Sequence, residues 1–176
     1  SSIAYHLAHA GWRDVLLLER DRLTSGTTWH AAGLMVTFGS TSGTSTALRK
    51  YSRDLYARLE AETGQSTGFE PIGFVELATN EDYLKEFRRV ADYNRLQGID
   101  VHEIGPADVK KLFPLCDVQD VLRAFHVPTD GRVNPVDATM ALCKGARRQG
   151  AQIVEGVEVI DVLHSEGRVT GVKTSD

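Results

Sequence analysis

The chain has 176 residues, of which 41% are hydrophobic and 25% charged, and its formal net charge is −4. These values are typical of a globular protein and exclude a disordered chain, while the acidic balance argues against a nucleic-acid partner. The longest apolar run, Val15–Leu18, is far shorter than the roughly 20 residues of a membrane span. Cys116 and Cys143 lack a metal-type spacing, so we expect reduced thiols, a reducing compartment and no metal site.

The first twenty residues have the pattern of the second half of a βαβ unit. Residues 1–11 predict a helix, because Ile3 and Leu7 share one face and Gly11 is suited to end it. Residues 15–20 predict a strand buried on both faces of a parallel sheet. Glu19 ends this strand, where such units place an acid that accepts ribose hydroxyls, although a solvated charge is also common there. The opening strand and G-x-G-x-x-G turn would lie before Ser1, so we interpret the chain as a fragment.

A run of small residues follows this strand, in the segment TSGTTWHAAGLM at residues 24–35. Gly26 and Gly33 flank His30, and the neighbouring threonines supply hydroxyl groups. Such a segment lets the backbone approach a ligand closely and offers donors to phosphate oxygens. Taken alone, the segment is equally compatible with a simple turn, and a lone histidine beside an aromatic residue is commonly structural.

Helix and strand patterns alternate through the rest of the chain. Helices are predicted over residues 46–63, with Leu48, Tyr51, Leu55 and Leu59 on the apolar face, and over 81–96, 106–112 and 136–149. Asn80, Pro106 and the pair Asn134–Pro135 are suited to open the last three. We expect Met140 and Cys143 on the core face of the final helix. Strands are predicted within residues 69–80, 101–104, 121–128, 152–156, 157–163 and 169–173.

This order of elements predicts an α/β fold. Residues 1–63 and 129–176 are interpreted as two segments of a Rossmann-like nucleotide-binding domain that lacks its first strand and glycine-rich turn. Residues 64–128 are interpreted as an inserted α+β region.

The stretch LLLERDRLTSGTTWHAAGLM resembles the flavin-attachment segment of the FAD-dependent D-amino-acid-oxidase-like family, in particular its dimethylglycine and sarcosine dehydrogenases. The resemblance continues through YARLEAETGQSTGF, IGFVELATN, LFPL, VPTDGRVNP and ARRQGAQIVEGVEV, and so covers nearly the whole chain. It implies an FAD-binding domain with residues 64–128 as a substrate-domain segment. It also implies covalent attachment of the flavin 8α-methyl carbon to His30, whose neutral imidazole is a competent nucleophile.

The resemblance assigns further residues to the cofactor. Glu19, with Arg20 beside it, would accept the ribose hydroxyls, and the backbone of Val159 would meet the adenine unless Val159 is a plain core residue. The loop around the pyrophosphate, the ribityl chain and the flavin edge would consist of Gly26, Thr27, Thr28, Trp29, Ala31, Ala32, Gly33 and Leu34. Trp29 would pack on the flavin or fill core. We assign no catalytic acid or base, and His126 is kept as a candidate substrate-domain residue.

The activity that the resemblance implies is oxidation of an N-methyl amino acid, dimethylglycine or sarcosine, by hydride transfer to FAD. Electron-transfer flavoprotein would take the electrons and tetrahydrofolate the one-carbon unit, in the mitochondrial matrix of a eukaryote or the cytoplasm of a bacterium. One alternative is a non-catalytic relative resembling the regulatory subunit of pyruvate dehydrogenase phosphatase, which lacks the motif histidine. Another is a fragment without activity of its own, because the dinucleotide turn and its helix N-terminus hold the pyrophosphate.

Overall fold

The computed structural model describes residues 1–175, which form two compact units. The first unit comprises Ser1–Ala32, Arg58–Gly68 and the chain from Asn134 onward, and the second comprises Gly33–Ala57 and Phe69–Val133. These boundaries differ from the predicted division at residues 63/64 and 128/129. The assignment of the segments to FAD and to substrate stays a prediction. No helix among residues 1–175 is both long enough and apolar enough to cross a lipid bilayer.

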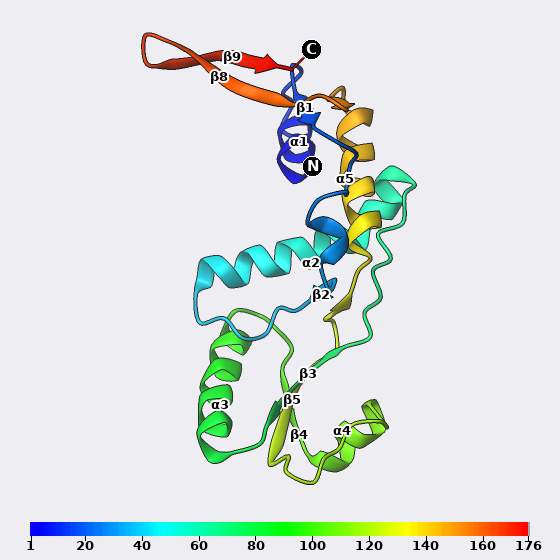
Figure 1. The fold of residues 1–176 in the computed structure, drawn as a ribbon. Coiled ribbons are helices and arrows are strands. Elements are labelled where there is room, and N and C mark those ends of the chain that lie inside the picture. Colours follow the sequence, from blue (N-terminus) through cyan, green and yellow to red (C-terminus); the bar gives the residue numbers. More distant parts are fainter. Residues whose placement is uncertain (176) are drawn as a thin grey trace. The chain divides into compact units, whose positions relative to one another are not determined.

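The first unit is built on helices α1 (Ser2–His9) and α5 (Pro135–Arg148), which pack against each other (Figure 1). Strands β1 (Leu16–Glu19) and β7 (Gln152–Glu155) pair in parallel, and β8 (Val159–Ser165) and β9 (Arg168–Thr174) form an antiparallel hairpin. Gly145 on α5 lets the Tyr5 ring of α1 approach closely, because a Cβ atom at this position would lie 2.8 Å from two atoms of the ring. The prediction of an α/β arrangement with a parallel strand pair is confirmed.

Cations of α5 fix the end of α2 (Gly43–Thr63), whose last residues belong to the first unit. Lys144 Nζ donates to the Gly64 carbonyl at 3.0 Å, and Arg148 Nη1 donates to the Glu62 carbonyl at 2.7 Å. The Tyr5 hydroxyl donates to the Glu62 carboxylate at 2.7 Å. These bonds satisfy carbonyl groups that a helix end leaves without intrahelical partners.

The second unit contains an antiparallel sheet in the order β3 (Phe74–Ala78), β5 (Arg123–Val127), β4 (His102–Ile104). Helix α3 (Glu81–Leu96) packs beside it, and the shared core includes Phe38, Val90 and Phe125. Helix α4 (Pro106–Leu112) contacts β5 (Figure 1). Two further strands of two residues each, β2 (Leu34–Met35) and β6 (Gly131–Arg132), pair antiparallel and were not predicted.

The predicted helix ends agree with the structure within two residues, except that α2 begins at Gly43 instead of residue 46, and some predicted burial is wrong. Leu16 is 56% exposed, so the prediction that this strand is buried on both faces is wrong at this residue. Leu48 and Tyr51 are also exposed, so only the later part of the α2 stripe is buried. Met140 is exposed as well, because the buried stripe of α5 starts at Ala138 and continues at three- and four-residue steps, which leaves Met140 on another face.

Candidate functional site

The carboxyl end of β1 lies beside the start of β8, around a cavity of about 310 Å³. Leu18, Glu19 and Arg20 line one side of it, and residues 157–159 line the other. The chain reaches this position because Glu19 lies opposite Glu155 in the β1–β7 ladder and its carbonyl then accepts from Val157 N at 3.0 Å. The structure therefore brings together Glu19, Arg20 and Val159, the three residues that the sequence assigns to adenosine.

The Glu19 carboxylate is half-buried and held in one orientation. Its Oε1 atom accepts from the backbone N–H of Asp21 at 3.0 Å. Arg20 points to the Asp21 carboxylate instead, at 3.2 Å, and both of these side chains are exposed. A carboxylate with one oxygen bound to a backbone N–H keeps its other oxygen as an acceptor, which suits a hydroxyl donor.

Residues 24–35, here called the His30 segment, follow a second carboxylate contact. Leu23 N donates to Glu155 Oε1 at 2.6 Å, across 132 positions of sequence. The next residue, Thr24, has φ +72°, a conformation that few non-glycine residues adopt. The entry to the segment is thus fixed by a hydrogen bond from a distant strand and by an uncommon backbone turn.

His30 ends a short 3₁₀ turn, η1 (Thr28–His30), which contacts α5 within the first unit. His30 N donates to the Thr27 carbonyl at 3.2 Å, and Ala31 N donates to the Thr28 carbonyl at 3.1 Å. The imidazole is exposed and lies against the Trp29 indole, with ring centroids 3.7 Å apart and a tilt of 31°. Trp29 is 61% exposed, so the interpretation of Trp29 as a core residue is wrong.

The exit of the His30 segment runs in the second unit. Gly33 has φ +74°, and its carbonyl accepts from Val133 N at 2.8 Å. Leu34 pairs with Arg132 in the β2–β6 ladder, while its side chain is 68% exposed. Gly33 and Leu34, which were predicted to contact the cofactor, are therefore held through their backbones, and the apolar side chain of Leu34 is exposed to solvent.

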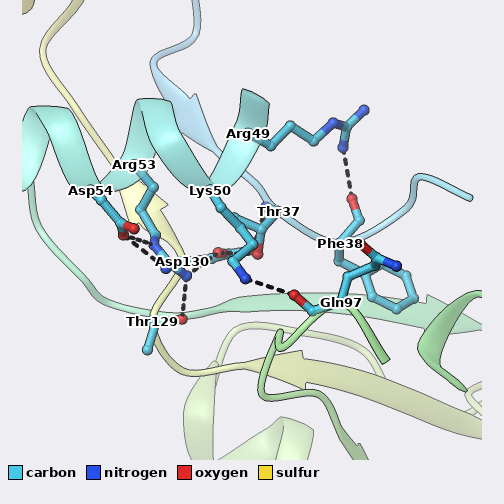
Figure 2. Close-up of polar contacts among 9 residues, drawn as sticks. All are labelled: Thr37, Phe38, Arg49, Lys50, Arg53, Asp54, Gln97, Thr129 and Asp130. Carbon is cyan, nitrogen blue, oxygen red and sulfur yellow. Dashed lines mark hydrogen bonds and ion pairs between the residues drawn. The ribbon is translucent and has the colours of Figure 1, made fainter. Parts of the chain in front are cut away.

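A buried polar cluster that the sequence did not reveal lies directly beyond this exit (Figure 2). Asp130 is fully buried, and its carboxylate accepts from both the backbone N–H and the hydroxyl of Thr37, each at 2.7 Å. Arg53 Nη1 lies 3.9 Å from the same carboxylate and donates to Thr129 Oγ1 at 2.9 Å. This role of Asp130 could not be predicted from the sequence, because nothing local in TDGR marks a partner 93 residues earlier.

Three basic side chains on one side of α2, Arg49, Lys50 and Arg53, point toward loops of the second unit in Figure 2. Arg49 donates to the Phe38 carbonyl at 2.8 Å and Lys50 to the Gln97 carbonyl at 2.6 Å, while Arg53 reaches the Asp130 cluster. These three side chains are therefore bound to the protein and do not form a simple solvated face. They hold the segment after β2 and the loop after α3 against the helix.

The exposed residues of the His30 segment fit the phosphate and flavin parts of FAD. Residues 24–35 contain hydroxyl and backbone donors and no acidic residue, which suits a pyrophosphate. A Cβ atom added at Gly26 would meet nothing within 4 Å, so a ligand can approach this backbone closely. Together with the cavity at Glu19, the donor set matches the chemistry that FAD requires.

Other polar groups in the second unit form no comparable site. Burial, and secondarily the neighbouring His102, lowers the pKa of His126, and the two rings lie 6.4 Å apart. Burial raises the pKa of Glu76. Another cavity of about 460 Å³ is lined by residues that include Arg53, Phe69 and Thr129. Residues 1–175 contain no group of three or more His, Cys, Asp or Glu side chains arranged to hold a metal ion.

Known proteins resemble this chain over nearly its whole length. Residues 1–176 match the family described as FAD dependent oxidoreductase, DAO. Dimethylglycine dehydrogenase of Rattus norvegicus is 42% identical over 152 residues, covering 85% of this chain and 17% of that protein. Sarcosine dehydrogenase of Homo sapiens is 38% identical over 176 residues, covering 97% and 19%. The pyruvate dehydrogenase phosphatase regulatory subunit of Mus musculus is 38% identical over 174 residues, covering 99% and 20%.

A solved structure agrees with these matches. The crystal structure of L-proline dehydrogenase from P. horikoshii superposes with a TM-score of 0.91 at 29% sequence identity. It covers 99% of this chain and 46% of that chain. The chain thus spans about a fifth of the curated relatives and about half of this structural neighbour.

Proposed function

Because this chain belongs to the DAO family of FAD-dependent oxidoreductases, we propose that it is the cofactor-attachment part of a longer flavin-dependent amine dehydrogenase. Its substrate would be an N-methyl amino acid, dimethylglycine or sarcosine. The names of two relatives and the exposed imidazole of His30 support this proposal. Electron-transfer flavoprotein and tetrahydrofolate as partners, and a mitochondrial matrix or bacterial cytoplasmic location, remain predictions from the resemblance.

The observation that carries the proposal is the position of His30. Its imidazole ends a short turn on the surface, beside one aromatic ring and surrounded in sequence by small residues that leave room for a ligand. A neutral imidazole nitrogen is a nucleophile near neutral pH. Attachment would replace one C–H bond of the 8α-methyl group with a C–N bond to His30. The two electrons would stay on the ring system, so an oxidant such as dioxygen has to restore the oxidised form.

The remaining site residues have binding and orienting roles in this proposal. Glu19 would accept hydroxyls of the adenosine ribose through the oxygen that Asp21 does not occupy. The backbone N–H and hydroxyl groups of Thr27 and Thr28 would face the pyrophosphate, and Val159 would border the adenine. When bound, FAD supplies the two-electron acceptor for amine oxidation.

Attachment is tested in the complete protein that contains this chain. After acid precipitation, flavin absorbance should remain with the polypeptide of the wild type and be released from His30→Ala. His164→Ala, which removes another exposed histidine on β8, is the matched control and should keep the flavin. Colour retained in His30→Ala would contradict the attachment proposal. Assays with dimethylglycine and with sarcosine, using an artificial electron acceptor, then decide the substrate.

A second candidate function is that of a non-catalytic relative, as for the pyruvate dehydrogenase phosphatase regulatory subunit. This chain is 38% identical to that protein, and the match covers 99% of this chain. This similarity supports a non-catalytic function as directly as the similarity to the dehydrogenases supports an enzymatic one. The histidine at position 30 supports the enzymatic function. A complete protein that binds FAD without covalent attachment and oxidises neither amine would support the non-catalytic function. The isolated 176-residue chain is expected to bind FAD poorly in either case.

A further inference from the structure

Asp130 is a fully buried carboxylate for which the proposed chemistry has no use. Removing a carboxylate from water is costly unless hydrogen bonds and opposite charge compensate it. Thr37 supplies two donors at 2.7 Å, and Arg53 supplies a cation at 3.9 Å (Figure 2). Thr37 is itself buried, so the hydrogen bonds between Thr37 and Asp130 are shielded from water. Both donors come from Thr37, which lies three positions after Leu34.

The Asp130 cluster is rigidly supported from α2. The Arg53 side chain is only 16% exposed. Its guanidinium is also bonded to Asp54, with Nη2 at 2.8 Å and Nε at 2.9 Å from Oδ1, and to Thr129 Oγ1 at 2.9 Å. The backbone of Asp130 is held as well, because its carbonyl accepts from Gly73 N at 2.7 Å. The carboxylate therefore has one orientation, which a mobile turn residue would not have.

This cluster fixes the exit of the His30 segment. Strand β2 has only two residues, so its ladder to β6 provides few hydrogen bonds. Asp130 directly precedes β6 and bonds Thr37, two residues after β2, so the same turn holds β2 at its carboxyl side. At the other side, Val133 N donates to the Gly33 carbonyl at 2.8 Å. Gly33 and Leu34 are consequently held between two attachments to residues 130–133.

We propose that Asp130 is a positioning residue that, through Thr37, sets the backbone of Gly33 and Leu34 where this segment meets the flavin. The inference rests on the proposed function for the role of Gly33 and Leu34. The hydrogen bonds and burial that fix these residues are independent of it. The Asp130 carboxylate is buried and bonded to Thr37, so the proposed effect acts through the backbone of the segment and needs no direct contact with the cofactor.

The test compares Thr37→Val with Thr37→Ser in the complete protein. Valine keeps the shape of threonine and the backbone N–H bond but removes the hydroxyl donor, whereas serine keeps both donors. Apoprotein is mixed with FAD, and the rate of covalent flavin attachment is followed by acid precipitation. Loss of one hydrogen bond to a charged group predicts attachment about tenfold slower in Thr37→Val. Thr37→Ser and the exposed control Thr41→Val should attach flavin close to the wild-type rate.

The outcomes separate this inference from the proposed function. In one outcome, the wild type attaches flavin through His30, and Thr37→Val attaches it at the same rate with an unchanged circular dichroism spectrum. This result overturns the positioning role and leaves the proposed function intact. Wild type that attaches no flavin overturns the proposed function and this inference with it. If Thr37→Val is insoluble, Asp130→Asn replaces it, because this variant keeps the shape and one acceptor. Attachment at the wild-type rate in soluble Asp130→Asn then overturns the inference.

Discussion

Gly145 permits a close contact between α5 and α1, and its replacement by alanine sets a gain in helix propensity against a steric cost. A Cβ atom at this position would lie 2.8 Å from Cδ2 and Cε2 of Tyr5 and 3.2 Å from Cγ2 of Thr63. The Tyr5 ring is 1% exposed and its hydroxyl is bonded to Glu62. The ring therefore cannot move aside without disturbing the core and that hydrogen bond.

The change in the free energy of unfolding is the difference between the gain in helix propensity and the steric cost. Alanine is better than glycine in a helix by about 1 kcal/mol, which would stabilise α5. Overpacking of a closely packed core costs about 1–3 kcal/mol, and a weakened Tyr5–Glu62 bond adds about 1 kcal/mol. The net expectation for Gly145→Ala is a loss of about 1–3 kcal/mol in the free energy of unfolding. The helix-propensity gain is outweighed because the obstacle is a buried ring.

The assay is urea unfolding of the 176-residue chain, followed by far-ultraviolet circular dichroism, as a double-mutant cycle with Tyr5→Leu. Leucine removes the ring atoms that the new methyl group would meet. In that background Gly145→Ala should become neutral or stabilising by up to about 1 kcal/mol, so the sign of its effect reverses. A higher urea midpoint for Gly145→Ala alone, or the same loss in both backgrounds, would refute the steric explanation.

Three further outcomes are expected. Glu155→Ala should make the Leu23 amide exchange with solvent roughly tenfold faster by hydrogen-exchange mass spectrometry, while Glu155→Gln keeps the acceptor and most of the protection. Asn134→Ala should lower the free energy of unfolding by about 1 kcal/mol in urea titrations, and Asn134→Ser should not, because both Asn and Ser can cap α5. Burial lowers the pKa of His126, so the unfolded chain binds its proton more tightly and stability falls as pH drops below about 6.5. His126→Gln should reduce that loss in stability measurements between pH 7 and 5, and the exposed control His164→Gln should leave it unchanged.

Local signals were sufficient for the helices and insufficient for the shortest strands. Asn80 accepts from Tyr83 N and Asn134 accepts from Val136 N, as their sequence context predicted, and Gly98 and Gly150 have the positive φ values expected after helices. Capping depends on neighbours within three or four residues. Strands β2 and β6 have two residues each and exist only because they pair with each other across almost a hundred positions. A periodicity cannot be recognised in two residues.

The same distinction applies to the candidate site. The strand-end pattern pointed to Glu19, and the family resemblance added Arg20 and Val159. The structure gathers all three around one cavity. The sequence did not identify Glu155 or Asp130, whose partners lie 132 and 93 positions away. An acid at a strand end or in a turn is usually solvated, so its sequence context contains no sign of the amide it binds.

These two acids explain how a segment of small residues can present a histidine in a defined way. Residues 24–35 are mostly glycine, alanine, serine and threonine, and such residues bury little surface to offset the conformational entropy lost on ordering. The small side chains that let a ligand approach the backbone therefore also provide little packing to hold the segment in place. Charge-assisted hydrogen bonds at the ends supply the missing constraint, from Glu155 at the entry and from Asp130 just beyond the exit. Loss of either acid should therefore impair flavin attachment although neither touches His30.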